Sequence, residues 1–235
     1  KFNFSQVYDL QNSSRTSFYR KYLLNISKWS STKTTLKKGE NKKNFDKNSV
    51  LKRFEIQLNS SGIKTKHTLK PDLSWSVVNI DKIINKYFNG KFILLFPFCS
   101  PNLSHKKWPY YNELIEIIKK ENPNLKIVIA PGPQEIDETK KINAISITHQ
   151  DKSINLSELA GLINKSSYVI ANDTGPAHMA AHLGKKGIVI FGHHTTPEKV
   201  SIETDKYKAI TVDSLENLRA ETVYQTIKEE IKLIN

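Results

Sequence analysis

The sequence predicts an α/β protein whose second part folds as a Rossmann-like domain around a parallel sheet. From residue 91 onward, short apolar runs alternate with segments of helical period, a succession typical of parallel βαβ units. Several of these runs end in turns rich in glycine, proline and polar residues, where such sheets bind ligands. Charge also separates the two parts, because residues 1–90 carry +12 and residues 91–235 carry only +1.

The chain of 235 residues has room for one large domain or two small ones. Its hydrophobic fraction of 38% supports a globular core, and no apolar run approaches the ~20 residues of a membrane-spanning helix. The N-terminus has neither an initiating methionine nor an apolar signal region, so we expect a processed product or a fragment. Cys99 is the single cysteine, which excludes an intramolecular disulfide and fits a reducing, cytoplasmic compartment.

The first ninety residues are basic and poor in regular elements. We predict a strand within 4–11, a partly helical segment at 14–24 and a long charged loop at 27–48. Residues 50–60 and 77–88 have the spacing of amphipathic helices. Such a basic excess indicates an anionic partner, although lysines that merely keep a loop solvated are the open alternative.

The second part carries the alternation that defines the domain. Its predicted strands are residues 92–98, 125–130, 144–148, 168–171, 187–191 and 207–212. Its predicted helical segments are residues 109–120, 135–141 (helical or irregular), 156–164, 177–183 and 215–233. We therefore predict a partial, basic N-terminal domain at 1–75, an interdomain linker or helix at 76–90 and a Rossmann-like domain at 91–235.

The most informative stretch reads as strand, tight turn, helix and strand between residues 167 and 192. Pro176 is expected at the first helical position, where its missing N–H costs nothing, and Gly184 is expected to end the helix. The unit places a helix N-terminus at the carboxyl end of a parallel strand. Free N–H groups and the helix dipole at such a position favour a phosphate.

The turn itself offers several ligand contacts. Gly175 is expected to permit the unusual backbone that a close ligand approach needs. Thr174 and the N–H groups near Ala177 are expected to bind phosphate oxygens. Asp173 would repel a phosphate, so a sugar hydroxyl is its expected partner. The alternative is that Asp173 and Thr174 only cap the helix, which leaves His178 unexplained.

Two further turns are expected at the same edge of the sheet. The turn after the first strand carries Ser100, Lys106 and Lys107, and a lysine there can neutralise a diphosphate as a point charge. Lys107 can equally be a surface charge. The turn after the second strand carries Glu135, whose carboxylate can accept hydrogen bonds from ribose hydroxyls or complement a helix dipole.

Four histidines surround the central unit. His178 and His182 are four residues apart on one helix, and His193 and His194 follow the next strand. A zinc cluster is the open alternative, but no HExxH motif occurs and no carboxylate is spaced to complete a site. We predict no metal site, with His178 facing a phosphate and the other three on the surface or in loops.

These turns, in this order, resemble glycosyltransferase family 9, the ADP-heptose:lipopolysaccharide heptosyltransferases. The matching stretches are VYDLQ at 7–11, KKWP at 106–109, GPQE at 132–135, INLSELAGLI at 154–163, ANDTGPAH at 171–178 and FGHHTTP at 191–197. The resemblance implies a GT-B fold, with two Rossmann-like domains and an active site in the cleft between them. The C-terminal domain would hold the nucleotide sugar, and the N-terminal, acceptor-side domain would be incomplete in this chain.

The resemblance also implies roles at the nucleotide. Cys99 and Ser100 fall where family members place small hydroxyl residues at the diphosphate, and the cysteine weakens that contact. Lys106 matches the lysine that neutralises the diphosphate. Glu135 matches the acidic residue that holds the ribose, and Ile154 falls where an apolar side chain packs on adenine.

At the central turn, the resemblance implies that Asp173 binds heptose hydroxyls. Thr174, Gly175 and His178 would bind the phosphates, with Pro176 beside them in the site. The family's opening glycine-rich loop with its catalytic aspartate has no counterpart in the sequence. The catalytic residue is therefore unknown, and the base is expected upstream of residue 1.

The function implied by the resemblance is an inverting transfer of heptose from ADP-heptose to the inner core of lipopolysaccharide. No metal cofactor is required if Lys106 and the helix terminus supply the positive charge. The partners would be the nucleotide-sugar donor, an anionic glycolipid acceptor and the cytoplasmic face of the inner membrane of a Gram-negative bacterium. The alternatives are another nucleotide sugar or a non-catalytic nucleotide-sugar binder. No nucleic-acid partner is expected, because the basic part has no recognised motif.

Overall fold

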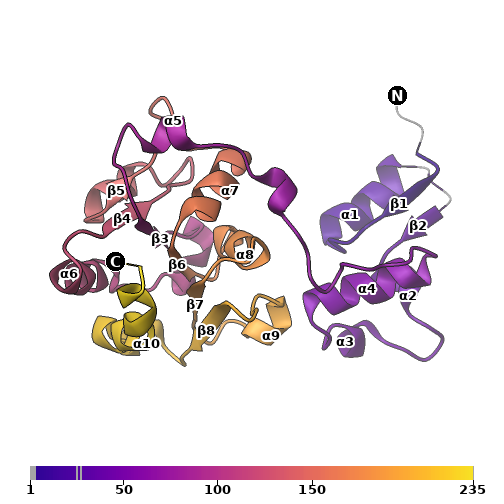
Figure 1. Cartoon of the computed structure of the whole chain (residues 1–235). Coiled ribbons are helices and arrows are strands. Elements are labelled where there is room, and N and C mark those ends of the chain that lie inside the picture. The colour runs from indigo at the N-terminus through magenta and orange to yellow at the C-terminus, as the bar shows by residue number, and fades with distance from the viewer. Residues whose placement is uncertain (1–3, 25, 27, 235) are drawn as a thin grey trace. The chain divides into compact units, whose positions relative to one another are not determined.

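The computed structural model describes residues 4–24, 26 and 28–234, which fall into two compact units (Figure 1). Unit 1 comprises residues 1–71 and 198–201, and unit 2 comprises residues 72–197 and 202–235. Among the helices of the described residues, none combines the length and the hydrophobicity that crossing a membrane requires. The predicted boundaries at residues 75 and 90 stay a prediction.

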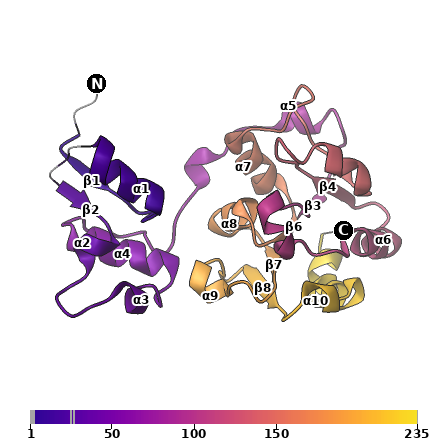
Figure 2. The same cartoon turned by 180° about the vertical axis from the view of Figure 1, so that it is seen from behind.

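Unit 2 is built on a six-stranded, all-parallel sheet with the order β5-β4-β3-β6-β7-β8 (Figure 2). The strands are β3 (Phe92–Phe96), β4 (Lys126–Ile129), β5 (Ile145–Ser146), β6 (Tyr168–Asn172), β7 (Gly187–Phe191) and β8 (Tyr207–Thr211). The chain runs outward from β3 through β4 to β5 and then returns to β6 on the other side of β3. The strand order therefore reverses between β3 and β6, and a ligand crevice is expected outside their carboxyl ends.

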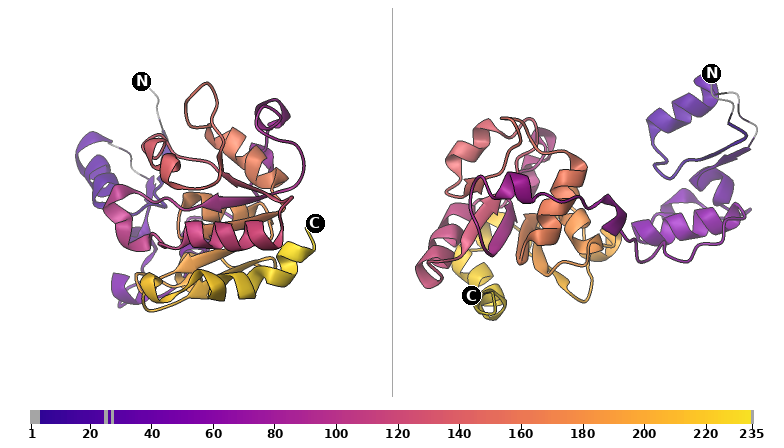
Figure 3. Two further views of the ribbon diagram at one scale, coloured as in Figure 1. Left: turned by 90° about the vertical axis from the view of Figure 1, so that its left-hand side faces the viewer. Right: turned by 45° about the horizontal axis from the view of Figure 1, so that its top comes forward.

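Helices cover both faces of this sheet (Figure 3). The longer ones are α6 (Tyr111–Glu121), α7 (Leu156–Lys165), α8 (Gly175–His182) and α10 (Ala220–Lys232), and α5 (Asp81–Ile84) is short. The short helix α9 (Pro197–Val200) belongs to unit 1 from residue 198 onward. Helices α6 and α10 pack together on one face, while α7 and α8 pack on the other. Helix α7 starts where predicted, because Asn155 Oδ1 accepts the Glu158 N–H at 2.9 Å and Glu158 Oε2 accepts the Asn155 N–H at 2.8 Å.

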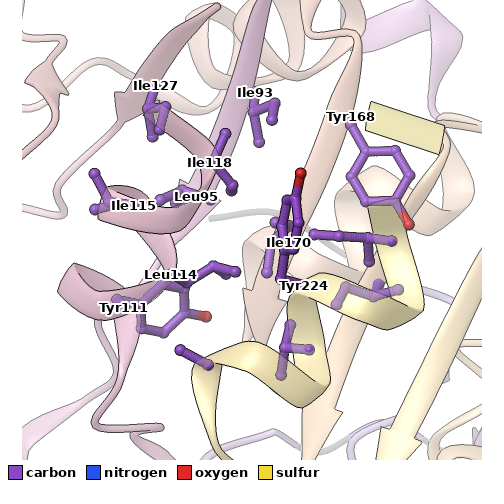
Figure 4. Packing of buried hydrophobic residues seen from close by; sticks show 14 of the residues in the cluster. Ile93, Leu95, Tyr111, Leu114, Ile115, Ile118, Ile127, Tyr168, Ile170 and Tyr224 are labelled. Atoms are coloured by element: carbon purple, nitrogen blue, oxygen red, sulfur yellow. The ribbon is translucent and has the colours of Figure 1, made fainter. Parts of the chain in front are cut away.

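The core of unit 2 follows from the alternation of side chains along each strand. Ile93 and Leu95 point to the same face of β3 and pack with Leu114 and Ile118 of α6 (Figure 4). All four side chains are fully buried. Leu94, on the opposite face of the strand, is buried as well, as expected for a strand covered on both sides.

One close approach in this sheet explains a glycine. A Cβ added to Gly187, at the start of β7, would overlap the carbonyl oxygen of Val169 in β6 and lie 2.7 Å from Tyr207 Cε2. Real side chains do not tolerate such contacts. The tight packing of β6, β7 and β8 therefore requires glycine at this position.

Unit 1 contains much less regular structure. Its elements are β1 (Gln6–Tyr8), α1 (Ser14–Phe18), a π-helical turn (Tyr19–Leu23), β2 (Lys28–Ser30), α2 (Thr32–Thr35), α3 (Lys42–Phe45) and α4 (Val50–Ser60). Strands β1 and β2 are parallel. The buried Gln57 of α4 connects them, because its Nε2 donates to the Asp9 carbonyl at 2.9 Å and to Ser30 Oγ at 3.3 Å.

The structure confirms all six predicted strands of unit 2, and α4 has exactly the predicted bounds of residues 50–60. The prediction of a helix between them is wrong over most of its length. Residues 77–80 are not helical, and the helix predicted at 77–88 is reduced to α5. Asn79 Oδ1 accepts the Asp81 N–H at 2.8 Å and starts the helix late. Residues 77–80 also pack closely against α7, because a Cβ added to Gly161 would overlap the Val78 carbonyl oxygen. This contact is made by non-helical chain.

The charged loop predicted at 27–48 contains β2, α2 and α3, although Ser27 itself lies outside the described residues. Local caps explain the two short helices. The Ser31 N–H donates to Thr34 Oγ1 at 2.8 Å at the start of α2, and Asn41 Oδ1 accepts the Asn44 N–H at 2.9 Å at α3. In unit 2, the segment predicted at 135–141 contains a 3₁₀-helix at Asp137–Lys141. The last predicted helix divides into a 3₁₀ turn at Leu215–Asn217 and α10.

Candidate functional site

A pocket of about 330 Å³ lies at the switch point of the unit 2 sheet. Its walls come from the segments that follow β3, β4 and β6, together with the start of α7. It brings together six of the predicted site residues, which are Ser100, Glu135, Ile154, Thr174, Gly175 and Pro176. The turns that the sequence placed at one edge of the sheet therefore share one cavity.

Much of the pocket wall is apolar. Phe98, Pro131 and Leu159 line it beside Ile154, as does the largely exposed Leu156. Sequence reasoning missed all of these except Ile154. Phe98 and Pro131 each lie two residues beyond the end of a strand, β3 and β4, so their closeness to strand ends was the available signal. An apolar wall of this kind suits a flat aromatic base.

Glu135 is held by its own turn. Its Oε2 accepts the Gly132 N–H at 2.7 Å, which closes the turn after β4. Among the described residues, Oε1 accepts no hydrogen bond. One carboxylate oxygen thus fixes the geometry, and the other is left for a hydroxyl of a ligand.

The start of α8 differs in one respect from the sequence prediction. The Thr174 carbonyl accepts the N–H groups of Ala177 at 3.1 Å and His178 at 3.3 Å, and the expectation that N–H groups near Ala177 bind phosphate stays a prediction. Gly175, at the first helical position, lines the pocket, and its N–H has no partner within the helix. Pro176 consequently stands second in the helix rather than first.

Gly175 does not have the unusual backbone expected of it. Its φ is not positive, unlike that of Gly184, which ends α8 at φ +67°. A Cβ added to Gly175 would meet no atom within 4 Å. The fold therefore does not need glycine here, and the open space beside its backbone is available to a ligand.

Asp173 lies at the centre of a polar cluster formed by Lys106, His178 and His194. Its carboxylate is 4% exposed, and its Oδ2 lies 2.6 Å from Lys106 Nζ and 3.0 Å from His194 Nε2. Its Oδ1 lies 3.5 Å from His178 Nε2. Burial by itself would raise the pKa of Asp173, but the three donors outweigh it and hold the pKa well below its usual value.

This cluster changes two interpretations of the sequence. Asp173 does not cap α8, and Thr174, the N-cap residue, makes no capping bond with its side chain. His194 lies in the loop after β7, one of the two places predicted for it, but its side chain is 9% exposed and bonded to Asp173, a contact that sequence reasoning missed. The signal was available in the sequence, since His194 follows β7 at the same edge of the sheet.

His193 and His182, which were also predicted on the surface or in loops, differ from each other in exposure. His193 is exposed, and its Nδ1 lies 3.1 Å from the Asp213 carbonyl. His182 is half-buried near His178, and burial lowers its pKa. Within residues 4–24, 26 and 28–234, no three histidine, cysteine or acidic side chains are grouped so that they could hold a metal ion.

Lys106 and Lys107 have different environments. Lys106 is 18% exposed and pairs with Asp173, so a diphosphate has to compete with that carboxylate or share the lysine with it. Lys107 is more exposed, pairs with Glu138 and lies 5.8 Å from the centre of the Phe98 ring. Of the two, Lys106 is the one next to the central turn.

Unit 1 has a pocket of its own, of about 450 Å³. Four cationic side chains line it, which are Arg20, Lys21, Lys33 and Lys42. Asp9 also lines it, and its Oδ1 accepts the Asn12 N–H at 2.9 Å, so this carboxylate shapes the turn after β1. The buried Ser31 Oγ has no partner among the described residues. The basic pocket, as we call it, suits an anionic ligand.

Comparison with known proteins gives consistent matches. Residues 2–230 match the family model described as glycosyltransferase family 9 (heptosyltransferase). A lipopolysaccharide core heptosyltransferase, OpsX of Haemophilus influenzae, is 31% identical over 112 residues, which are 46% of this chain and 32% of that protein.

Solved structures give the same result. Heptosyltransferase WaaC of E. coli with ADP has a TM-score of 0.58 at 20% identity, over 77% of this chain and 56% of that one. ADP-heptose lipopolysaccharide heptosyltransferase II of E. coli has a TM-score of 0.59 at 16% identity, over 79% and 62%. A family 9 glycosyltransferase of Veillonella parvula has a TM-score of 0.60 at 14% identity, over 89% and 64%.

These likenesses confirm the predicted GT-B class for this mixed α/β chain with parallel sheets. The chain spans about a third of the length of its curated relative and less than two thirds of each of these solved structures.

Proposed function

The chain belongs to glycosyltransferase family 9, and from this premise we propose that unit 2 binds the ADP part of ADP-heptose for transfer to lipopolysaccharide. The pocket at the switch point carries the proposal, because it joins an apolar wall, a free carboxylate oxygen and a helix start. These three features match the base, the ribose and the phosphates of a nucleotide. That solved relatives were determined with ADP and with ADP-2-deoxy-2-fluoro heptose supports the choice of donor.

We propose the following arrangement in the pocket. Adenine packs against Ile154 and Phe98, and a ribose hydroxyl donates to Glu135 Oε1. The diphosphate lies at the Thr174 side chain and the Gly175 N–H, at the start of α8. His178 and Lys106 stand beside it, and a heptose hydroxyl donates to Asp173.

In the proposed reaction, a deprotonated acceptor hydroxyl attacks the anomeric carbon in line, and ADP leaves with inversion. The lysine and the helix start stabilise the charge that grows on the departing diphosphate. In this proposal these groups supply the positive charge and no metal is required. The base that deprotonates the acceptor is proposed to lie outside unit 2.

Calorimetric titration with ADP tests the nucleotide site. The Lys106→Gln variant keeps a hydrogen-bond donor near Asp173 but loses the charge, and we expect its affinity for ADP to fall. A charge-assisted contact contributes about 1.5–3 kcal/mol, or roughly tenfold to a hundredfold in affinity. Lys107→Gln is the matched control and should bind ADP as the parent does. An unchanged affinity in Lys106→Gln would remove this lysine from the diphosphate site.

We also propose that unit 1 binds the anionic acceptor through its basic pocket, at the cytoplasmic face of the inner membrane. Four cations around one cavity attract phosphate and carboxylate groups, such as those of lipid A and Kdo. No nucleic acid is a proposed partner. Each basic residue near an anionic lipid surface contributes about 1 kcal/mol, and salt screens this attraction.

Binding to micelles of a Kdo-bearing lipid A acceptor tests this proposal. The double variant Lys33→Glu and Lys42→Glu reverses two charges that line the basic pocket and should lose most of the binding. Lys37→Glu with Lys38→Glu makes the same charge change outside that pocket and should lose much less. Equal losses in the two variants would show a general charge effect and no role for the pocket.

A further inference from the structure

Three strand ends supply the groups around Asp173. Lys106 comes from the segment after β3, Asp173 itself follows β6, and His194 follows β7. Both Lys106 and His194 bond to the same oxygen, Oδ2, at 2.6 and 3.0 Å. Only Lys106 is a permanent cation among them. The buried carboxylate therefore depends on a lysine that the proposed function assigns to the diphosphate.

The structure holds the His194 ring in place from several sides. The ring stacks on Phe191 of β7, with centroids 5.9 Å apart and an angle of 17°, and meets the edge of His105 at 5.4 Å. A Cβ on Gly192 would lie 3.6 Å from His194 Nδ1, so the backbone passes close to the ring. His194 is therefore a packed residue with a defined orientation.

The hydrogen-bond pattern determines the tautomer of this ring. Asp173 is ionised and can only accept, so His194 Nε2 must carry the proton that it donates. Its Nδ1 is buried and has no partner among the described residues, so a second proton there would also be unpaired. Burial lowers the pKa of His194, and the nearby Lys106 and His105 act in the same direction. The hydrogen bond to Asp173 opposes this shift but does not reverse it. The ring is thus a neutral donor at neutral pH.

We propose that His194 is a positioning residue that holds the Asp173 carboxylate when Lys106 turns to the diphosphate of the donor. This inference rests on the proposed function. An unpaired buried carboxylate is strongly unfavourable, so Lys106 can leave Asp173 only if other donors remain. His194 Nε2 on Oδ2, with His178 beyond Oδ1, supplies them without adding a charge that competes for the phosphate. The effect of His194 on ADP binding passes through Asp173 and Lys106, without contact with the nucleotide.

Replacement of the donor tests the inference. His194→Phe keeps an aromatic ring on Phe191 but cannot donate, and we expect its affinity for ADP to fall at least tenfold. Its affinity for adenosine, which has no diphosphate, should stay unchanged. His194→Gln returns an amide donor near the same place and should recover most of the ADP affinity. His193→Phe, on the exposed neighbour, is the matched control and should have no effect.

A double-mutant cycle separates positioning from a structural role. In an Asp173→Asn background there is no buried charge to hold, so His194→Phe should have no further effect on ADP binding. Equal losses for ADP and adenosine, or the same loss in the Asp173→Asn background, would overturn the inference. If the parent chain binds no ADP, the proposed function fails and the inference falls with it. If the parent binds ADP and His194→Phe binds it equally well, only the inference fails.

Nitrogen NMR of the unmodified chain gives a readout that does not depend on the folding of a variant. The His194 signals should report a neutral ring with its proton on Nε2, both without ADP and at saturation. The Lys106 Nζ signal should move when ADP binds, because the lysine changes its partner. A Lys106 signal that stays in place at saturating ADP would contradict the exchange of partners.

Discussion

Units 1 and 2 bury different kinds of side chain. The unit 2 sheet is covered on both faces and encloses a large aliphatic and aromatic core. In the described part of unit 1, only Trp29 and Phe45 are buried hydrophobic residues, and they share the interior with polar side chains. These polar residues are Asp9, Ser30, Ser31, Thr32 and Gln57. Apolar burial therefore stabilises unit 2, while unit 1 depends on hydrogen bonds, each of which contributes less.

The pockets of the two units differ in the same way. The unit 2 pocket has an apolar wall with a few placed polar groups, which selects a ligand by shape and hydrogen bonds. The basic pocket of unit 1 has four cations, which select by charge. A shape-selective pocket in one unit and a charge-selective pocket in the other fit the proposed nucleotide-sugar donor and the proposed anionic acceptor.

The largest effect is expected from truncating a core side chain in each unit. Ile118→Ala in the fully buried face of α6 should lower the free energy of unfolding of unit 2 by about 2–5 kcal/mol. Phe45→Ala in unit 1 should speed hydrogen exchange in unit 1 and leave ADP affinity unchanged. Chemical denaturation, exchange mass spectrometry and calorimetry measure these outcomes. Loss of ADP binding in Phe45→Ala would show that the two units do not behave separately.

Two glycines allow a smaller comparison within unit 2. Gly187→Ala places a Cβ against Val169 and Tyr207, and such overpacking should cost about 1–3 kcal/mol or more of stability. Gly175→Ala places its Cβ in open space, so the thermal midpoint should stay close to that of the parent. If a nucleotide approaches the Gly175 backbone, this variant should bind ADP more weakly. Normal ADP affinity in a folded Gly175→Ala chain would place the diphosphate elsewhere.

The smallest expected effect is the response of the polar cluster to acid. The folded pKa of Asp173 is lowered, so its ionised form adds stability above about pH 3.8, and this contribution is lost as the pH falls through the lowered folded pKa. The pKa of His194 is also lowered, so the chain loses some stability as the pH falls below about 6.5. In the Asp173→Asn variant, the free energy of unfolding, measured by denaturation at a series of pH values, should therefore fall less steeply at acid pH than in the parent (the acid limb of the curve). An identical acid limb in the variant would mean that other groups set it.

Sequence periodicity by itself determined the strands of unit 2, the bounds of α4 and the capped start of α7. These features depend on residues close together in the chain, such as the apolar run at 92–96 or the Asn155–Glu158 box. The same reasoning predicted that Ser100, Glu135 and Thr174 lie at one edge of the sheet. Parallel strands make that prediction possible, because their carboxyl ends all lie at the same edge.

Only the tertiary structure decided which groups meet at that edge. Local pattern predicted a helix at 77–88, but Val78 passes Gly161, more than eighty residues away, as extended chain. Asp173 looked like a free ligand for a sugar, yet Lys106 and His194 bond to it from sixty-seven residues before and twenty-one residues after it. Hydrophobic period records which side of an element is buried, but it does not record the partner of a charge. That partner is determined by distances between strand ends, which exist only once the sheet has formed.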